Sequence, residues 1–208
     1  MFLDRCSFMF TLSRPCYLDL SSTRASYARQ IVRDSNGSTN VSFSTFARTS
    51  TCDVFVLSDL HTDYPENMEW IKSLPTKKFQ KDALIVAGDV AETYGCFLET
   101  MSILKDRFKH VFFVPGNHDL WCRRDYPHES LEKLNMLLDA CRRLGVETKP
   151  TIIGSLGIVP LFSWYHESFD KEDEIRGVRI PPLEMACKDF HACKWSKGLS
   201  SRDDSLAI

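Results

Sequence analysis

The sequence lacks three features, each of which would indicate a particular class of protein. No apolar run approaches the roughly 18–20 residues that a helix needs to cross a bilayer, which excludes a membrane-spanning helix within these 208 residues. Basic residues are not in excess, since 26 Lys and Arg stand against 28 Asp and Glu. This balance argues against a partner held by a strongly basic face, such as long nucleic acid. The eight cysteines contain no CxxC pair, and their diffuse spacing indicates buried thiols in a reducing compartment rather than a disulfide framework.

Residues 1–50 differ in composition from the rest of the chain. They hold ten Ser, five Thr, six Arg and no Lys, with only three acidic residues, whereas 25 acidic residues outnumber 20 basic ones from residue 51 onward. An Arg- and Ser-rich leader that is poor in acids is typical of a transit peptide to a plastid or a mitochondrion. We therefore predict a disordered leader at 1–50 and an intracellular, organellar location. The alternative is a disordered extension without a targeting role.

From residue 51 the sequence alternates between short apolar runs and helical patterns. Strands are predicted at 54–57, 83–87, 111–114, 151–153 and 156–161, and helices at 66–74, 92–107, 128–144 and 181–195. Strands that are apolar on both faces and alternate with helices indicate a buried, mostly parallel sheet flanked by helices. The predicted fold class is therefore α/β.

Polar side chains that can hold a metal or move a proton follow each of the first three predicted strands. They are Asp59 and His61, then Asp89, then Asn117, His118 and Asp119. The intervals of 30 residues (59 to 89) and 28 residues (89 to 117) are each about the length of one βαβ unit. Parallel strands deliver their carboxyl ends to one edge of a sheet, so we expect these side chains to meet there. A mixed oxygen and nitrogen donor set suits Mn²⁺, Fe or Zn²⁺.

Three short motifs also give the chain a family resemblance. Ser58-Asp59-Leu60-His61, Gly88-Asp89-Val90 and Gly116-Asn117-His118-Asp119 resemble the first three motifs of the calcineurin-like metallophosphoesterase superfamily in order, spacing and strand-end position. The resemblance spans residues 52–165. It implies an α/β sandwich that holds two divalent metal ions, Mn, Fe or Zn, at its strand ends.

The resemblance also implies a role for each motif residue. Asp59 and His61 would hold the first metal ion, Asp89 would bridge both ions, and Asn117 would bind the second ion. His118 would stabilise the transferring phosphoryl group or protonate the leaving oxygen. Asp119 would orient the His118 imidazole and, as a neighbouring acid, keep it protonated.

The sequence departs from the family pattern after these motifs. No His follows a Gly and no His-x-His occurs, although family members carry such motifs on later strands. The second ion would therefore keep only Asp89 and Asn117, and we expect a weakened second site. The polar end at 197–208 leads us to expect a truncated family member, with a partial phosphoesterase domain at 51–208 and a sandwich that is incomplete at its C-terminus.

The resemblance implies hydrolysis of a phosphate ester, by a phosphatase or a phosphodiesterase, with a metal-activated hydroxide as nucleophile. One alternative is a catalytically impaired, truncated member that acts only by binding a metal, a phosphorylated ligand or a partner. Another is an α/β domain whose strand-end acids are only helix caps and turn residues. The partner implied is a phosphorylated substrate, whose class the sequence leaves open.

Overall fold

The structure is a computed structural model that describes residues 52–124, 129–169 and 181–202, together with residues 171, 173, 177, 179 and 205 and the backbone of two short strands nearer the N-terminus. These strands, β1 (Gln30–Arg33) and β2 (Thr39–Ser42), pair antiparallel. The rest of the predicted leader lies outside the described residues, so the leader and its organellar role stay predictions. Among the helices described, none combines the length and the apolar character that a bilayer crossing needs.

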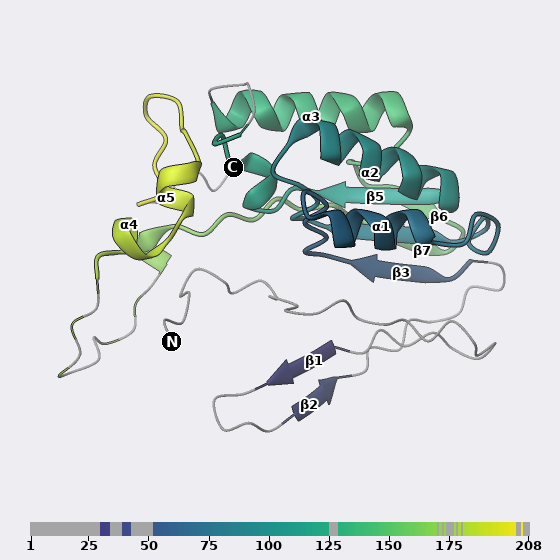
Figure 1. Ribbon diagram of the computed structural model, residues 1–208, viewed down its shortest axis with the longest axis horizontal. Coiled ribbons are helices and arrows are strands. Elements are labelled where there is room, and N and C mark those ends of the chain that lie inside the picture. Colours follow the sequence, from purple (N-terminus) through teal and green to yellow (C-terminus); the bar gives the residue numbers. More distant parts are fainter. Residues whose placement is uncertain are drawn as a thin grey trace.

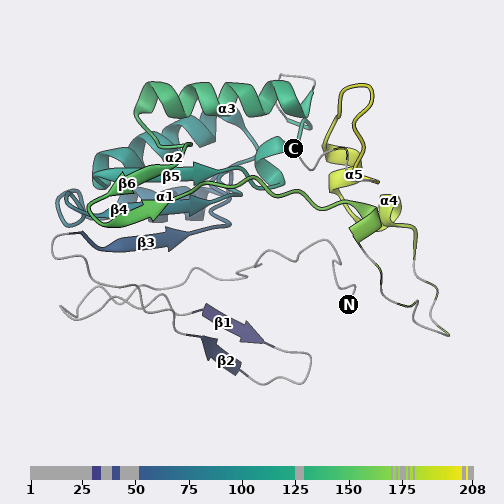
Figure 2. The same ribbon diagram turned by 180° about the vertical axis from the view of Figure 1, so that it is seen from behind.

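Three parallel strands form the centre of the fold. β3 (Val54–Leu57), β4 (Ala83–Ala87) and β5 (His110–Val114) lie side by side in that order. Val54 pairs with Ala83, and Ala83 pairs with His110 on its other side, so the three strands start level with one another. All three therefore end at one edge of the sheet, as Figures 1 and 2 show together. The predicted parallel sheet is confirmed.

Three long helices accompany this sheet. α1 (Pro65–Ser73) follows β3, α2 (Tyr94–Arg107) follows β4, and α3 (Ser130–Leu144) follows β5 after the short 3-10 helix η1 (His118–Leu120). Proline suits the first turn of α1, where no intrahelical partner for its missing N–H exists. Gly145 ends α3 in the left-handed conformation (φ 70°) that glycine adopts without strain. These three helices lie within two residues of the bounds predicted at 66–74, 92–107 and 128–144.

One apolar core joins the sheet to these helices. Leu84 and Val86 of β4 are fully buried in the same cluster as Ile71 of α1 and Phe97 and Met101 of α2. Removing this much apolar surface from water is the main term that stabilises the fold. The packed core also fixes the strand ends, and hence the loops that follow them, relative to one another.

A hairpin lies on the other side of the sheet. β6 (Thr151–Ile153) and β7 (Leu156–Ile158) pair antiparallel, and β7 ends before the predicted residue 161. Figures 1 and 2 together show α1 on one face of the sheet and this hairpin towards the opposite face.

The C-terminal helical pattern forms two short helices instead of one. After the 3-10 helix η2 (Glu167–Phe169), the chain forms α4 (Leu183–Ala186) and α5 (Asp189–Ala192). The single helix predicted at 181–195 is wrong, because the backbone at Cys187 is extended (φ −103°, ψ 119°). This break redirects α5 towards the loop that follows β5, to which the chain is hydrogen-bonded at Ala192.

Candidate metal centre

Three predicted ligands share an unusual backbone conformation. Asp59 (φ 54°), His61 (φ 43°) and Asp89 (φ 54°) are the non-glycine residues with positive φ in the described part of the chain. A side chain in this region costs about 1–3 kcal/mol, and such strain persists only where surrounding contacts impose it. The strain therefore coincides with the residues that the motifs single out.

Hydrogen bonds between the strand-end loops impose this conformation. The backbone N–H of Asp59 donates to Gly88 O (3.2 Å), and that of His61 donates to Asp89 O (3.0 Å). The N–H of His118, from the loop after β5, donates to Asp89 Oδ1 (2.9 Å). The Asp89 loop is thus tied to both of its neighbours, and the three motifs meet at one place as the sequence predicts.

Glycine at position 116 lets the loops after β4 and β5 approach one another. A Cβ added to Gly116 would lie 2.2 Å from Asp89 Oδ1 and 2.6 Å from the Asp89 nitrogen, far inside van der Waals contact. Gly88, with φ 83°, lies against the same Gly116 backbone. The backbones of the two loops approach so closely here that glycine is needed at both positions.

Donor atoms from all three loops converge at this point. Ligand atoms of His61, Asp89 and His118 all lie within 4.8 Å of one another. Asp59 Oδ1 lies 3.9 Å from His61 Nε2, at the edge of the same group. Imidazole and carboxylate donors in one partly buried cluster fit a divalent transition metal. Of the remaining predicted ligands, Asn117 lies in the loop after β5, and its side chain is bonded to Asp189.

Burial sets the protonation of these groups in the metal-free protein. It raises the pKa of Asp89 to about 8, with the Asp119 carboxylate adding to the effect, and it raises the pKa of Asp59. Burial lowers the pKa of His61 and lowers the pKa of His118 to about 3. The expectation that Asp119 keeps His118 protonated is wrong for the metal-free protein, because burial of the ring lowers its pKa and the neighbouring His61 and Arg123 lower it further. Both imidazoles are neutral at pH 7, the form that can bind a metal.

The Asp119 side chain has a different position from the one expected of a partner to His118. It is fully buried, and its two oxygens accept hydrogen bonds from four backbone N–H groups, those of Asp89, Val90, Ala91 and Gly116 (2.8–3.2 Å). Burial raises the pKa of Asp119 to about 6, against the opposing effect of these bonds. The carboxylate joins the loops after β4 and β5, so the structure gives it a role in holding backbone rather than in orienting the imidazole.

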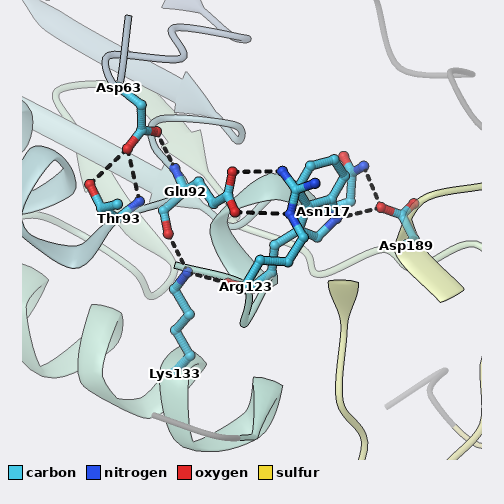
Figure 3. A network of polar contacts seen from close by, with 8 residues as sticks. Asp63, Glu92, Thr93, Asn117, Arg123, Lys133 and Asp189 are labelled. Atoms are coloured by element: carbon cyan, nitrogen blue, oxygen red, sulfur yellow. Dashed lines mark hydrogen bonds and ion pairs between the residues drawn. The ribbon is translucent and has the colours of Figure 1, made fainter. Parts of the chain in front are cut away.

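A polar network beside the site was not predicted from the sequence (Figure 3). Asp63 accepts hydrogen bonds from the N–H groups at the start of α2, including that of Glu92 (2.5 Å). Glu92 is paired through both carboxylate oxygens with Arg123 (3.0 and 2.8 Å). The buried Lys133 donates to the carbonyl oxygens of Glu92 and Trp121 (2.5 Å each). The nearest signal in the sequence is the position of Asp63 two residues after His61, in the same polar loop.

Trp121 connects this network to the site. Its indole stacks on the His118 ring with 3.6 Å between ring centroids, and the Arg123 guanidinium lies 4.3 Å from the indole centroid. Trp121 is 3% exposed. The His118 ring therefore rests on a buried, well-supported surface.

Comparisons with known proteins agree with the α/β fold. The sequence model of the calcineurin-like phosphoesterase family matches residues 53–184. The chain is 35% identical over 139 residues to the [acyl-carrier-protein] phosphodiesterase PptH of Mycobacterium tuberculosis, a match that covers 61% of this chain and 43% of that protein. It is also similar to the crystal structure of the phosphopantetheinyl hydrolase PptH from Mycobacterium tuberculosis, with a TM-score of 0.59 and 26% identity over 73% of this chain and 58% of that one. The chain thus spans less than half the length of the curated relative.

Proposed function

The chain belongs to the calcineurin-like phosphoesterase family, a family of hydrolases, and from this premise we propose that it is a metal-dependent phosphodiesterase. The observation that carries the proposal is the cluster of His61, Asp89 and His118, whose donor atoms come from three separate strand-end loops to within 4.8 Å. The similarity to an acyl-carrier-protein phosphodiesterase supports a diester rather than a monoester as the preferred substrate.

We propose the following division of roles among the donors. Asp59 and His61 would hold one divalent ion, Asp89 would contribute to both sites, and Asn117 would hold a second ion. Bound divalent ions would neutralise charge on the phosphoryl oxygens and lower the pKa of a water molecule at the site. The identity of the ions, Mn, Fe or Zn, is part of what the experiment below measures.

His118 acts on the substrate as a neutral hydrogen-bond donor in this proposal. Its low pKa in the metal-free protein keeps the ring uncharged at pH 7, and the Trp121 indole fixes the ring plane. A neutral imidazole N–H can donate to a phosphoryl oxygen, and an anionic substrate beside it raises its pKa towards the range in which it can protonate a leaving oxygen.

The proposed substrate class is a phosphodiester that joins a phosphopantetheinyl group to a carrier protein. The names of both PptH comparisons point to this bond, whose cleavage would release phosphopantetheine and leave the protein hydroxyl free. A protein-borne diester needs an accessible site, and the polar, partly exposed side chains of Asp59 and His61 are consistent with one.

The test is hydrolysis by the full chain of a chromogenic phosphodiester and phosphomonoester, and of a phosphopantetheinylated carrier protein followed by mass spectrometry. The chain is stripped of metal and reloaded with Mn²⁺, Fe²⁺ or Zn²⁺ in turn. We expect faster diester than monoester turnover, loss of turnover in Asp89→Asn, and no effect of Asp139→Asn, which removes an exposed carboxylate on α3. Monoester turnover faster than diester turnover would contradict the choice of substrate.

A second candidate is a protein that binds metal and a phosphorylated ligand without turning it over. The predicted ligands of the second ion, Asp89 and Asn117, are few, and this favours a weak second site. Stoichiometric metal content without turnover of any of the three substrates would establish this candidate and exclude the first.

A further inference from the structure

The segment that contains α5 is hydrogen-bonded to the loop after β5 and to the first residue of α3. The N–H of Cys122 donates to Ala192 O (2.7 Å), and the N–H of Ser130 donates to Lys194 O (2.8 Å). In return, the Lys194 N–H donates to Ser130 Oγ (2.9 Å), and Ser130 is fully buried. These backbone contacts fix the segment against the loop that carries the third motif.

The same segment brings a carboxylate to two residues of that loop. Asp189 Oδ1 accepts hydrogen bonds from Asn117 Nδ2 (2.8 Å) and from Trp121 Nε1 (2.6 Å), as Figure 3 shows for the side chains of Asp189 and Asn117. Asp189 lies beyond residues 53–184, which the family model matches.

The bond to Asn117 determines which way its amide faces. A carboxylate can only accept, so the Asn117 NH₂ group must point towards Asp189. The amide is planar, so fixing its nitrogen also fixes the direction of its oxygen, on the side turned away from Asp189. Outer partners that orient a ligand in this way typically change metal affinity or activity about 10–100-fold when they are removed.

The hydrogen bond between Trp121 and Asp189 affects His118, the motif residue that follows Asn117. The indole is held at its edge by Asp189 and on its face by Arg123, and the His118 ring stacks on it at 3.6 Å. Rotation of the indole would therefore displace the ring that rests on it.

We propose that Asp189 is a positioning residue, which through one carboxylate oxygen orients the Asn117 amide towards the second metal ion and holds Trp121 beneath His118. This inference rests on the proposed function, since it assumes that Asn117 is a ligand. Asp189 itself acts through Asn117 and Trp121.

A double-mutant cycle tests the Asn117 branch in the full chain. Mn²⁺ binding to the metal-stripped protein is followed by calorimetry and by EPR for the parent, Asp189→Asn, Asn117→Ala and the double variant. We expect Asp189→Asn to lower the affinity for the second Mn²⁺ ion about 10–100-fold. The affinity for the first ion should stay within about twofold of the parent value. In the Asn117→Ala background the same change should have no further effect, because the residue through which Asp189 acts is gone. Asp139→Asn, which removes an exposed carboxylate, is the control.

Unchanged second-ion affinity in Asp189→Asn, or an effect of equal size in both backgrounds, would overturn the inference, as would a parent chain that binds a single ion. If the parent chain binds two ions but does not turn over substrate, the proposed function is contradicted and the inference about Asp189 is not. The double-mutant cycle with Mn²⁺ then still decides the role of Asp189.

Trp121→Phe tests the second branch and does not depend on the folding of Asp189→Asn. The variant keeps an aromatic ring beside His118, and it removes the five-membered ring of the indole with the N–H that donates to Asp189. We expect kcat to fall about tenfold with KM and Mn²⁺ affinity unchanged. Full kcat in this variant would overturn the Trp121 branch.

Discussion

Burial raises the pKa of Asp89 to about 8, with the Asp119 carboxylate adding to the effect, and this links metal binding to pH. Below pH 8 the protonated form predominates, so an ion that binds Asp89 must displace a proton. Burial lowers the pKa values of His61 and His118, so these imidazoles contribute less to the proton release than Asp89 does. We expect the Mn²⁺ association constant to rise about tenfold per pH unit from pH 6 to 8 and to level off above.

Calorimetry in two buffers of different ionisation enthalpy measures this proton release directly. Asp89→Asn is the matched variant, because it carries no titrating group at that position and should bind any remaining Mn²⁺ without releasing a proton from it. An association constant that is flat between pH 6 and 8 in the parent would contradict the prediction.

Asp119 joins the loops after β4 and β5 through four backbone hydrogen bonds. Replacing it by Asn puts an NH₂ group where backbone N–H groups now donate, and a buried donor without an acceptor costs about 1–3 kcal/mol. We expect Asp119→Asn to lower the free energy of unfolding by about 3 kcal/mol at pH 7.5, measured by urea denaturation of the metal-free chain. The control Asp139→Asn should have a free energy of unfolding within about 0.5 kcal/mol of the parent value. Equal free energies of unfolding for the two variants would refute the role of Asp119 in joining the loops.

At the scale of elements, the contact between the loops after β4 and β5 can be tested at two glycines. Gly116→Ala would drive a methyl group into Asp89, whereas Gly95 in the first turn of α2 has no heavy atom within 4 Å of an added Cβ. We expect Gly116→Ala to cost about 1–3 kcal/mol of stability and to weaken Mn²⁺ binding. Gly95→Ala should be neutral or stabilising by up to about 1 kcal/mol. Thermal melts and Mn²⁺ titrations measure both variants. Mn²⁺ binding by Gly116→Ala as tight as that of the parent would contradict the prediction.

The elements of the site could be predicted where local sequence leaves few alternatives. β3 and β4 have the predicted bounds because each is a continuous apolar run closed by polar residues. The convergence of Asp59, Asp89 and the third motif at one edge required only that the strands be parallel.

The rest of the site depends on contacts between distant parts of the chain. The left-handed conformation of Asp59 and Asp89 is imposed by bonds between loops, which no local pattern encodes. Asp119 adjoins His118 in sequence, yet most of its donors belong to the loop about 30 positions earlier. Asp189 lies 72 positions after Asn117, in a four-residue helix too short to give a periodic signal.

At the scale of the whole molecule, large apolar side chains are exposed on the hairpin side of the sheet. Ile152 on β6 is 78% exposed, and Leu161, after β7, is 75% exposed. With a formal net charge of −2, charge repulsion between copies of the chain is weak. Exposed apolar side chains under these conditions favour self-association.

The last prediction compares two variants of one hairpin that change charge equally. Ile152→Glu removes an exposed apolar side chain, whereas Ser155→Glu, in the turn of the same hairpin, only adds a charge. If apolar contact drives association, Ile152→Glu should raise about tenfold the concentration at which light scattering detects self-association. Burying such a side chain contributes about 1.5–3 kcal/mol. Ser155→Glu should have a much smaller effect, and both variants should bind Mn²⁺ like the parent, because the metal centre lies at the strand ends and not on the hairpin. Equal effects of the two variants would mean that charge alone controls association.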